Sequence, residues 1–398
     1  MLYQPKKEAI ALENLFEYID WRADLTFSEA PQNKIDGLIF AELSYIPFEN
    51  VVPVVGEGKE ITLAEASRAF FELHGENFSL GAILPHEILL LLKACASSKR
   101  FSGVKLWGYV NDICLEVEKQ FSAICFSCDN KVTYIVFRGT DDTIVGWKED
   151  LNMALFTPIP SQREGLKYLE LVSKKKRDKL IIAGHSKGGN IAIYSALNAP
   201  ANLKKRMLAV YSYDGPGFKD TYIDAFKNDI IVDRIKTFLP NKSFIGRIFD
   251  IIGDYEIIKS RDKGVQQHDA FTWKLKGSSF LTADHFEAPS DNFHELLKAW
   301  VAKLTPMERR DFVESFYKLL TLNGAETLTD ISNQKFKFLI SLISKSGDDK
   351  KIVFDAFMKL IKEKNMLSSA RKKEKKQALA NEKKKKSNGE KRPTDEGN

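Results

Sequence analysis

Long apolar runs, paired cysteines and a leader-like N-terminus are missing from this 398-residue sequence. The leucine-rich run at residues 88–92 is far shorter than the roughly 20 apolar residues that cross a bilayer, and Lys93 follows it. Residues 1–10 carry charges with no apolar stretch behind them, unlike a secretory signal. We therefore expect no membrane span and no signal peptide, and we predict a cytoplasmic protein.

The few cysteines argue against an oxidising compartment and against a metal site. Cys95, Cys114, Cys125 and Cys128 do not have the spacing of a disulfide framework, so we expect all four to be reduced. Cys125 and Cys128 form a single C-x-x-C pair, whereas a structural zinc ion needs four ligands. The sequence predicts neither a metal ion nor a cofactor.

The formal net charge of +6 is concentrated at one end of the chain. Residues 371–398 hold 11 basic and 5 acidic side chains, whereas the first 370 residues hold 49 of each sign. Apolar content also falls there, so we expect a disordered tail or a frayed helix. Because each basic residue near an anionic membrane contributes about 1 kcal/mol, the tail could bind a membrane peripherally. A solvated tail is the alternative, and no motif indicates specific nucleic-acid recognition.

Periodicity divides the chain into four regions. We expect a helical cover over residues 1–98, an α/β core over residues 99–288, further helices over residues 289–368, and the lysine-rich tail over residues 369–398. Thr62 with Glu65, and Thr305 with Glu308, have the spacing of helix-capping pairs. The C-terminal amphipathic stretches could form a lid, a partner-binding unit or plain packing against the core; they lie at residues 305–324, 336–344 and 352–361.

The core region alternates strand and helix patterns. Strand patterns occupy residues 107–110, 121–126 and 132–138, and then 179–184, 207–213, 231–238 and 270–275. Helical patterns at residues 162–173 and 218–226 separate the later strands. Such alternation predicts an α/β fold with a mostly parallel sheet, preceded by an antiparallel hairpin.

One strand pattern runs directly into a helical pattern, with Gly184, Ser186 and Gly188 at the junction. A serine hydroxyl is a weak nucleophile, so it must be lifted by a tight turn toward a base and toward backbone N–H groups. Glycines at positions 184 and 188 remove side chains that would clash in such a turn. Ser186 is therefore our candidate nucleophile, and an ordinary strand–helix turn is the alternative.

A second motif lies about 45 residues earlier, where an apolar strand leads into Phe137-Arg138-Gly139-Thr140, followed by Trp147 and Asp150. Together with the serine turn, this order resembles the class 3 (fungal-type) lipases. Residues 15–280 further resemble a bacterial family of uncharacterised α/β hydrolases called Mbeg-like. The segments that carry this second resemblance are residues 18–22, 43–45, 214–218, 243–246 and 267–273.

The resemblance implies an α/β-hydrolase fold with a C-terminal helical extension, and an acyl ester or lipid as the substrate. It also implies that the amides of Thr140 and Lys187 form the oxyanion hole. Such donors must lie about 2.7 to 3.1 Å from the developing oxyanion, and losing one costs roughly a hundred- to thousandfold in rate. Residues 143–147 fall where class 3 lipases carry their lid.

A serine hydrolase of this type needs a histidine late in the chain. His268, His285 and His294 follow Ser186. We favour His268, which stands at the start of a predicted strand and matches the family pattern. His285 is the rival, whereas His294 has the spacing of a helix surface. His185 precedes the nucleophile directly and is expected to face away from it.

The acid departs from the lipase pattern. Class 3 lipases place Asp after the strand equivalent to residues 231–238, but no carboxylate follows that strand here before residue 247. Asp214 ends the preceding strand and is our first candidate, followed by Asp254 and by Asn241 as a neutral alternative. A triad without its carboxylate loses about four orders of magnitude in rate.

Two functions therefore stay open. The first is a cytosolic serine esterase or lipase in which Ser186 attacks the ester, His268 moves the proton, and Asp214 orients His268. The second is a catalytically weak or inactive scaffold that binds a protein or membrane partner through the C-terminal helices and the basic tail.

Overall fold

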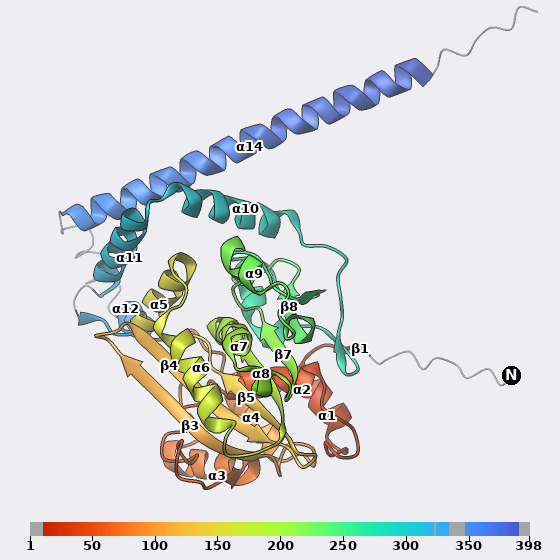
Figure 1. The fold of residues 1–398 in the computed structure, drawn as a ribbon, viewed down its shortest axis with the longest axis vertical. Helices are drawn as coiled ribbons and strands as arrows, with labels where there is room; N and C mark the ends of the chain where they lie inside the picture. The colour runs from red at the N-terminus through yellow and green to blue at the C-terminus, as the bar shows by residue number, and fades with distance from the viewer. Residues whose placement is uncertain (1–10, 322–323, 334–346, 390–398) are drawn as a thin grey trace, which may run out of the picture.

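A computed structural model describes residues 11–321, 324–333 and 347–389 (Figure 1). Its centre is an eight-stranded sheet with the order β2-β3-β4-β5-β6-β7-β8-β9. The first four strands pair antiparallel, and β5 to β9 are parallel. The strands are β2 (Ile61–Thr62), β3 (Lys105–Cys114), β4 (Lys119–Ser127), β5 (Val132–Phe137), β6 (Lys179–His185), β7 (Met207–Tyr213), β8 (Ile235–Pro240) and β9 (Asp254–Ile258).

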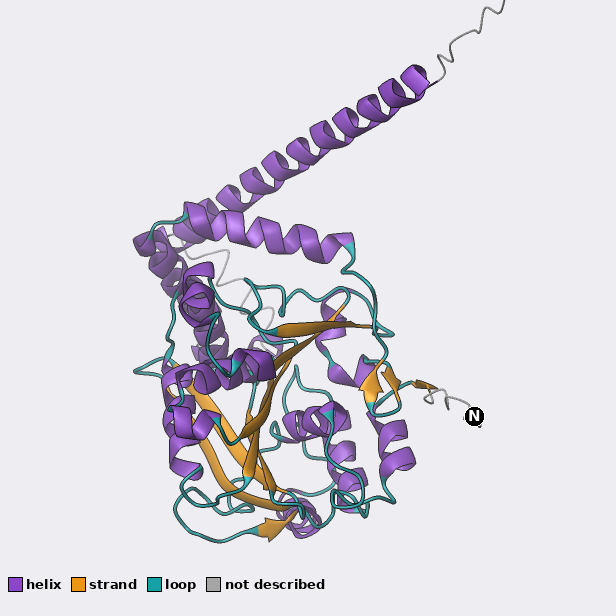
Figure 2. Ribbon diagram, turned by 45° about the vertical axis from the view of Figure 1, so that its right-hand side comes forward, coloured by secondary structure: helices purple, strands orange, loops and turns teal. Residues whose placement is uncertain are grey.

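Helices cover both faces of this sheet (Figure 2). Alternate side chains of one strand point to opposite faces, so Ile181 packs with the N-terminal helices while Ile182 packs with the other layer. The N-terminal layer holds α1 (Leu15–Arg22), α2 (Lys34–Leu43), α3 (Leu63–His74) and α4 (Glu87–Ala96). The opposite layer holds α6 (Pro160–Val172), α7 (Lys187–Asn198), α8 (Ala201–Lys204) and α9 (Asp220–Phe226). The predicted α/β-hydrolase fold with a mostly parallel sheet is confirmed.

A buried ion pair fixes the N-terminal layer. Arg100 and Asp36 have no solvent-exposed side-chain surface, and Arg100 Nη2 lies 2.6 Å from Asp36 Oδ2. Tyr18 Oη donates to Asp36 Oδ1 over 2.9 Å, so α1, α2 and Arg100, four residues after the end of α4, meet at one carboxylate. Burying two charges costs desolvation free energy, and removing one partner strongly destabilises the fold because the other charge is then left buried and unpaired. It therefore fixes how the cover sits on the sheet.

The C-terminal helices are α10 (Ala288–Lys303), α11 (Pro306–Leu320), α12 (Leu328–Asn333) and α14 (Asp348–Gly389). α10, α11 and α14 share a small core, which includes Val301, Phe312 and Val353 together with Phe249 of the hydrolase core. The distal part of α14 extends away from the rest of the molecule (Figures 1 and 2). This helix continues through much of the lysine-rich region, where the sequence favoured disorder or a frayed helix.

Both predicted capping pairs are present. The hydroxyls of Thr62 and Thr305 accept from the amides of Glu65 and Glu308, and each glutamate accepts in return from the threonine amide. The predicted amphipathic stretch at residues 336–344 lies outside the described residues, as do residues 1–10 and 390–398.

The predicted strand at residues 270–275 is largely wrong. Ala270–Thr272 forms a 3-10 turn (η3), because the Asp269 carboxylate accepts from the Phe271 amide and the Trp273 indole donates to Gln267 O. Trp273 is extended and forms an isolated bridge with Ser260, and Leu275–Lys276 is strand β10, in a small sheet with β1 (Ala11–Leu12) and β11 (Ser279–Phe280). The edge strand β9 and the helix α5 (Ile144–Leu155) were not predicted.

Candidate active site

Ser186 lies at the turn between β6 and α7 with φ 55° and ψ −131°, a conformation that costs a non-glycine residue about 1 to 3 kcal/mol. The turn is closely packed. A Cβ on Gly184 would lie 2.2 Å from the Gly188 carbonyl carbon, and one on Gly188 would lie 2.0 Å from Phe137 O. The Ser186 amide donates to Tyr213 O of β7 over 2.9 Å. The sequence around Ser186 therefore forms the strained turn that a nucleophilic serine requires.

Thr140 and Lys187 both line the cavity that contains Ser186. Lys187 is the first residue of α7, and the first amides of a helix have no acceptor within it. Thr140 follows β5, and Gly139 allows its loop to approach the serine turn, since a Cβ there would lie 2.8 Å from His185 O. The Thr140 hydroxyl donates to both Asp150 oxygens, at 2.7 and 2.8 Å. The Thr140 loop and the first turn of α7 therefore both border the cavity that contains Ser186.

The Lys187 side chain points into the protein and is completely buried. Its Nζ lies 3.0 Å from Glu149 Oε2 and donates to Gln120 O over 3.0 Å. Glu149 in turn accepts from the Gln120 amide and from the Ser161 amide and hydroxyl. This network joins the first turn of α7 to β4, α5 and α6. It fixes the position of the Lys187 amide.

His268 and Asp214 form a hydrogen bond of 2.7 Å between Nδ1 and Oδ2. Asp214 is buried at the end of β7, and the His268 side chain is 27% exposed, on the 3-10 turn η2 (Gly264–His268). A carboxylate can only accept, so Nδ1 donates and Nε2 of the neutral ring is left as an acceptor. This is the tautomer that a general base needs.

Asp214 is itself held in place by its surroundings. Its Oδ1 accepts from the Ser243 hydroxyl over 2.5 Å and from the Gly246 amide over 3.2 Å. A Cβ at Gly246 would lie 2.4 Å from this oxygen, so glycine is required for the close approach. The loop after β8, which lacks the lipase carboxylate, instead supplies the donors that orient Asp214.

The ring of His185 lies beside that of His268, with 4.6 Å between the ring centroids, and both of its nitrogens are hydrogen-bonded. Its Nε2 donates to His268 O over 3.0 Å, and its Nδ1 accepts from the Tyr45 hydroxyl over 3.0 Å. Burial lowers the pKa of His185 well below its usual value, and His268 lowers it further. His185 therefore supports the backbone of His268, and it is not a competing base because its acceptor nitrogen is already bonded to the Tyr45 hydroxyl.

These residues meet in a cavity of about 740 Å³. Ser186, Thr140, Lys187 and His268 line it, together with residues of α5 and of the C-terminal helices. This volume lies within the range of ordinary small-molecule sites. The residues chosen from the sequence as nucleophile, base and oxyanion donors therefore share one cavity.

A family model described as Mbeg1-like matches residues 95–318, more than half of the chain. The chain belongs to the Mbeg1-like family. A search of curated proteins finds no match. Among solved structures, the Rhizomucor miehei lipase–propeptide complex is 14% identical over 64% of this chain and 75% of that chain, with a TM-score of 0.37. M37 lipase is 16% identical over 54% of this chain and 69% of that chain, with a TM-score of 0.34. A Penicillium expansum triacylglycerol lipase is 14% identical over 47% of this chain and 84% of that chain, with a TM-score of 0.30.

The other candidates lie away from this site of the Mbeg1-like protein. Asp254 is exposed at the start of β9, and His285 is exposed in the loop before α10. His294 Nδ1 donates to Arg247 O, and its Nε2 lies 3.4 Å from Asp250. Asn241 accepts from the Gln267 amide group over 3.3 Å, so it supports the residue before His268 without touching the imidazole.

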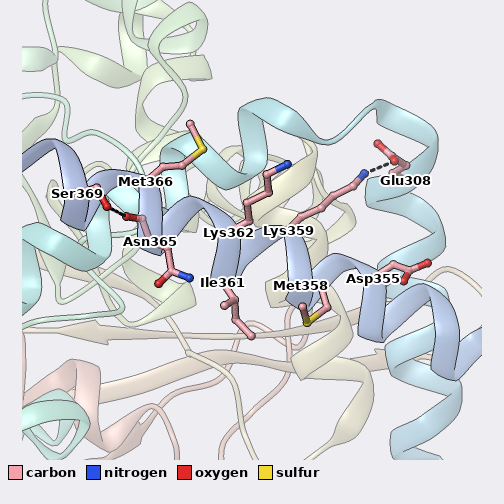
Figure 3. Close-up of a pocket in the computed structure, with 9 residues that line it drawn as sticks. All are labelled: Glu308, Asp355, Met358, Lys359, Ile361, Lys362, Asn365, Met366 and Ser369. Carbon is pink, nitrogen blue, oxygen red and sulfur yellow. Dashed lines mark hydrogen bonds and ion pairs between the residues drawn. The ribbon is translucent and has the colours of Figure 1, made fainter.

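A second hollow of the Mbeg1-like protein lies between α11 and α14 (Figure 3). Its side chains include Met358, Ile361 and Met366, and Lys359 pairs with Glu308. Ser369 donates to Asn365 O of the same helix, and no histidine lines the hollow, all of whose residues lie in the described part of α11 and α14. It offers no nucleophile–base pair.

Searches of the described residues give two further results. No group of three or more His, Cys, Asp or Glu side chains there could hold a metal ion. None of the helices in residues 11–321, 324–333 and 347–389 is long and apolar enough to cross a bilayer.

Proposed function

We propose that the protein is a serine hydrolase that cleaves acyl esters. The observation that carries the proposal is the 2.7 Å hydrogen bond between His268 and Asp214 in the cavity that also contains the strained Ser186. A buried carboxylate, an imidazole with a free acceptor nitrogen and a raised serine are the parts of an acyl-transfer site.

In the first half of the reaction, Ser186 Oγ attacks the ester carbonyl carbon and His268 Nε2 takes its proton. The Thr140 and Lys187 amides donate to the resulting oxyanion, and Asp214 stabilises the imidazolium. The tetrahedral intermediate collapses when the carbon–oxygen bond to the alcohol breaks. His268 then gives its proton to the departing alcohol, which leaves an acyl ester on Ser186.

In the second half, water attacks the acyl carbon while His268 takes its proton. Collapse of this second intermediate breaks the bond to Ser186 Oγ, which regains the proton from His268. The carboxylic acid leaves, and the enzyme returns to its starting state. Each proton that His268 accepts is given back, so the cycle needs no cofactor.

The proposal also answers the main reason for considering an inactive scaffold. That hypothesis was motivated by the missing carboxylate after residues 231–238. Asp214, from the preceding strand, contacts His268 and supplies an acid from a different position.

A fluorophosphonate probe tests the nucleophile. Wild type should become labelled at Ser186, and Ser186→Ala should abolish labelling, because the probe needs an activated hydroxyl. Ser369→Ala is the matched control, since this serine is exposed on α14, and it should label as wild type does. Equal labelling of the Ser186→Ala protein would contradict the proposal.

A further inference from the structure

The C-terminal helices reach into the cavity that contains Ser186. Phe293, Leu297 and Trp300 of α10 line it, as do Phe312 and Val313 of α11. These side chains stand more than 100 residues after Ser186, outside the strands and helices that hold the reacting groups. We call α10 and α11 the roof helices. Their cavity-facing surface is apolar and aromatic, which suits an alkyl chain and offers no donor for a polar group other than the Trp300 indole.

The roof helices are attached both to α14 and to the hydrolase core. The Trp300 indole donates to Ala356 O of α14 over 3.0 Å, so its N–H is already used. Lys148 of α5 forms an ion pair of 2.9 Å with Glu314 of α11. His294 Nδ1 of α10 donates to Arg247 O, in the loop after β8, over 2.7 Å. The roof is therefore a fixed wall of the cavity in this structure.

The apolar surface continues from the roof onto neighbouring elements. Leu151 and Met153 of α5 line the same cavity, and so do Ile245, Ile248 and Phe249 from the loop after β8. Burial of a methylene group against such a wall contributes about 0.8 kcal/mol. An extended alkyl group would thus gain affinity with each carbon until the space is filled.

The cavity lining also includes four acidic residues, which we call the acidic wall. They are Glu42, Asp150, Asp262 and Asp269, whereas Lys187 is the only lysine or arginine among the lining residues, all of which are described. The Lys187 ammonium is already paired with Glu149. An anionic group would therefore meet carboxyl groups and no available cation.

Glu42 adds a polar group that the reaction does not use. Its side chain is 3% exposed, and its buried Oε1 has no hydrogen-bond partner among the described residues. Burial raises the pKa of Glu42 well above its usual value, and Asp269 raises it further, which favours the protonated form of the carboxyl group. A neutral carboxylic acid can donate to a hydroxyl as well as accept from it.

Given the proposed hydrolase function, on which this inference rests, we propose that the roof helices form the acyl subsite. The substrate is then an ester between a long alkyl carboxylic acid and an uncharged, hydroxyl-bearing alcohol. The roof binds the alkyl chain, and the acidic wall accepts the alcohol while excluding phosphate-bearing alcohols.

The acyl subsite is tested with p-nitrophenyl esters from acetate to palmitate. We expect kcat/KM to rise by up to about fourfold per methylene group until the cavity is filled. Leu297→Trp should lower the ratio of palmitate to butyrate turnover by at least about tenfold, because the indole would occupy the subsite. Met307→Trp is the matched control: this residue lies on α11 but is 72% exposed, and the ratio should stay as in wild type.

Binding to the Ser186→Ala protein separates the two proposals. Titration calorimetry with 1-palmitoylglycerol should detect binding that Leu297→Trp weakens, whether or not the wild type hydrolyses any ester. If 1-palmitoylglycerol binds in this way but the wild type shows neither turnover nor probe labelling, the hydrolase proposal is refuted and the acyl-subsite proposal is retained. If kcat/KM does not depend on the acyl chain length, or if Leu297→Trp leaves that dependence unchanged, the acyl-subsite proposal is overturned and the hydrolase proposal is retained. Absence of both binding and turnover would overturn both.

The acidic wall is tested with 1-palmitoylglycerol against its 3-phosphate, which have the same acyl chain. We expect at least about tenfold higher kcat/KM for the uncharged ester. Asp262→Asn should reduce this preference severalfold, whereas Asp224→Asn, on the exposed surface of α9, should not. Equal or faster turnover of the phosphate ester would overturn the assignment of the alcohol.

Discussion

The hydrolase core and the C-terminal helices bury their apolar side chains to different extents. Tyr134, Phe137 and Trp273 of the core have no exposed surface, whereas Phe354 on α14 and Met307 on α11 are 63% and 72% exposed. All the proposed reacting groups belong to the first region, and only walls of the cavity belong to the second. We therefore expect the proposed chemistry to depend on the tightly packed region, and we expect substitutions in the more exposed region to change selectivity at little cost to the fold.

The largest effect is expected for Asp214→Asn. An asparagine amide would present an N–H to His268 Nδ1 and hold the imidazole in the wrong tautomer, which lowers kcat by about 10⁴-fold. Ester hydrolysis measures the loss. Asp254→Asn is the control, because that exposed residue should change kcat less than twofold. A kcat of the Asp214→Asn protein within tenfold of wild type would assign the acid elsewhere.

The second largest effect is expected for Lys187→Ala. This substitution retains the backbone amide proposed for the oxyanion hole but removes the ammonium group that pairs with the buried Glu149. The free energy of unfolding should fall by about 3 to 5 kcal/mol. Urea denaturation measures it. Lys227→Ala removes a pair with Asp224 whose side chains are 60% and 70% exposed, and should cost at most about 1 kcal/mol. Similar losses in the two variants would contradict the role given to the buried network.

The packing contrast itself is tested by two truncations. Ile182→Ala in the core should lower the free energy of unfolding by about 2 to 5 kcal/mol, since the side chain is completely buried. Phe354→Ala on α14 should change it by less than about 0.5 kcal/mol. Equal losses of stability in the two variants would contradict the packing contrast.

The smallest expected effect depends on pH. Burial raises the pKa of Asp150 from 3.8 to about 6. The folded protein therefore keeps this proton where the unfolded chain has released it, so the stability from this group is present below about pH 4 and lost as the pH rises to about 6. Asparagine does not titrate. The free energy of unfolding of Asp150→Asn minus that of wild type should thus rise by up to about 3 kcal/mol between about pH 4 and 7. A flat difference would show that Asp150 is not perturbed.

The elements of the core could be predicted because their signals are local. The glycines at 184 and 188 and the apolar strand before them indicate the serine turn directly. His268 and Asp214 were chosen from short sets of candidates, helped by the family resemblance. Their roles stay predictions until activity is measured, although the structure brings the two side chains together.

What the sequence did not reveal depends on contacts between distant residues. Nothing near Lys187 indicates that its side chain is buried against Glu149, 38 residues earlier. Ser243 and Gly246 matched a family motif, but their contact with Asp214 had no local signal. The amphipathic C-terminal stretches predicted helices without predicting that α10 and α11 line the cavity. The expected contact of the basic tail with anionic membranes stays a prediction.

The left-handed backbone at Ser186 has one more consequence. Glycine adopts this conformation without penalty, so a chain with no reaction to perform would become more thermostable by exchanging Ser186 for glycine. Retaining a hydroxyl there means that heat resistance has been given up at a single position. The Ser186→Gly protein should therefore be both the least reactive and one of the hardest to melt.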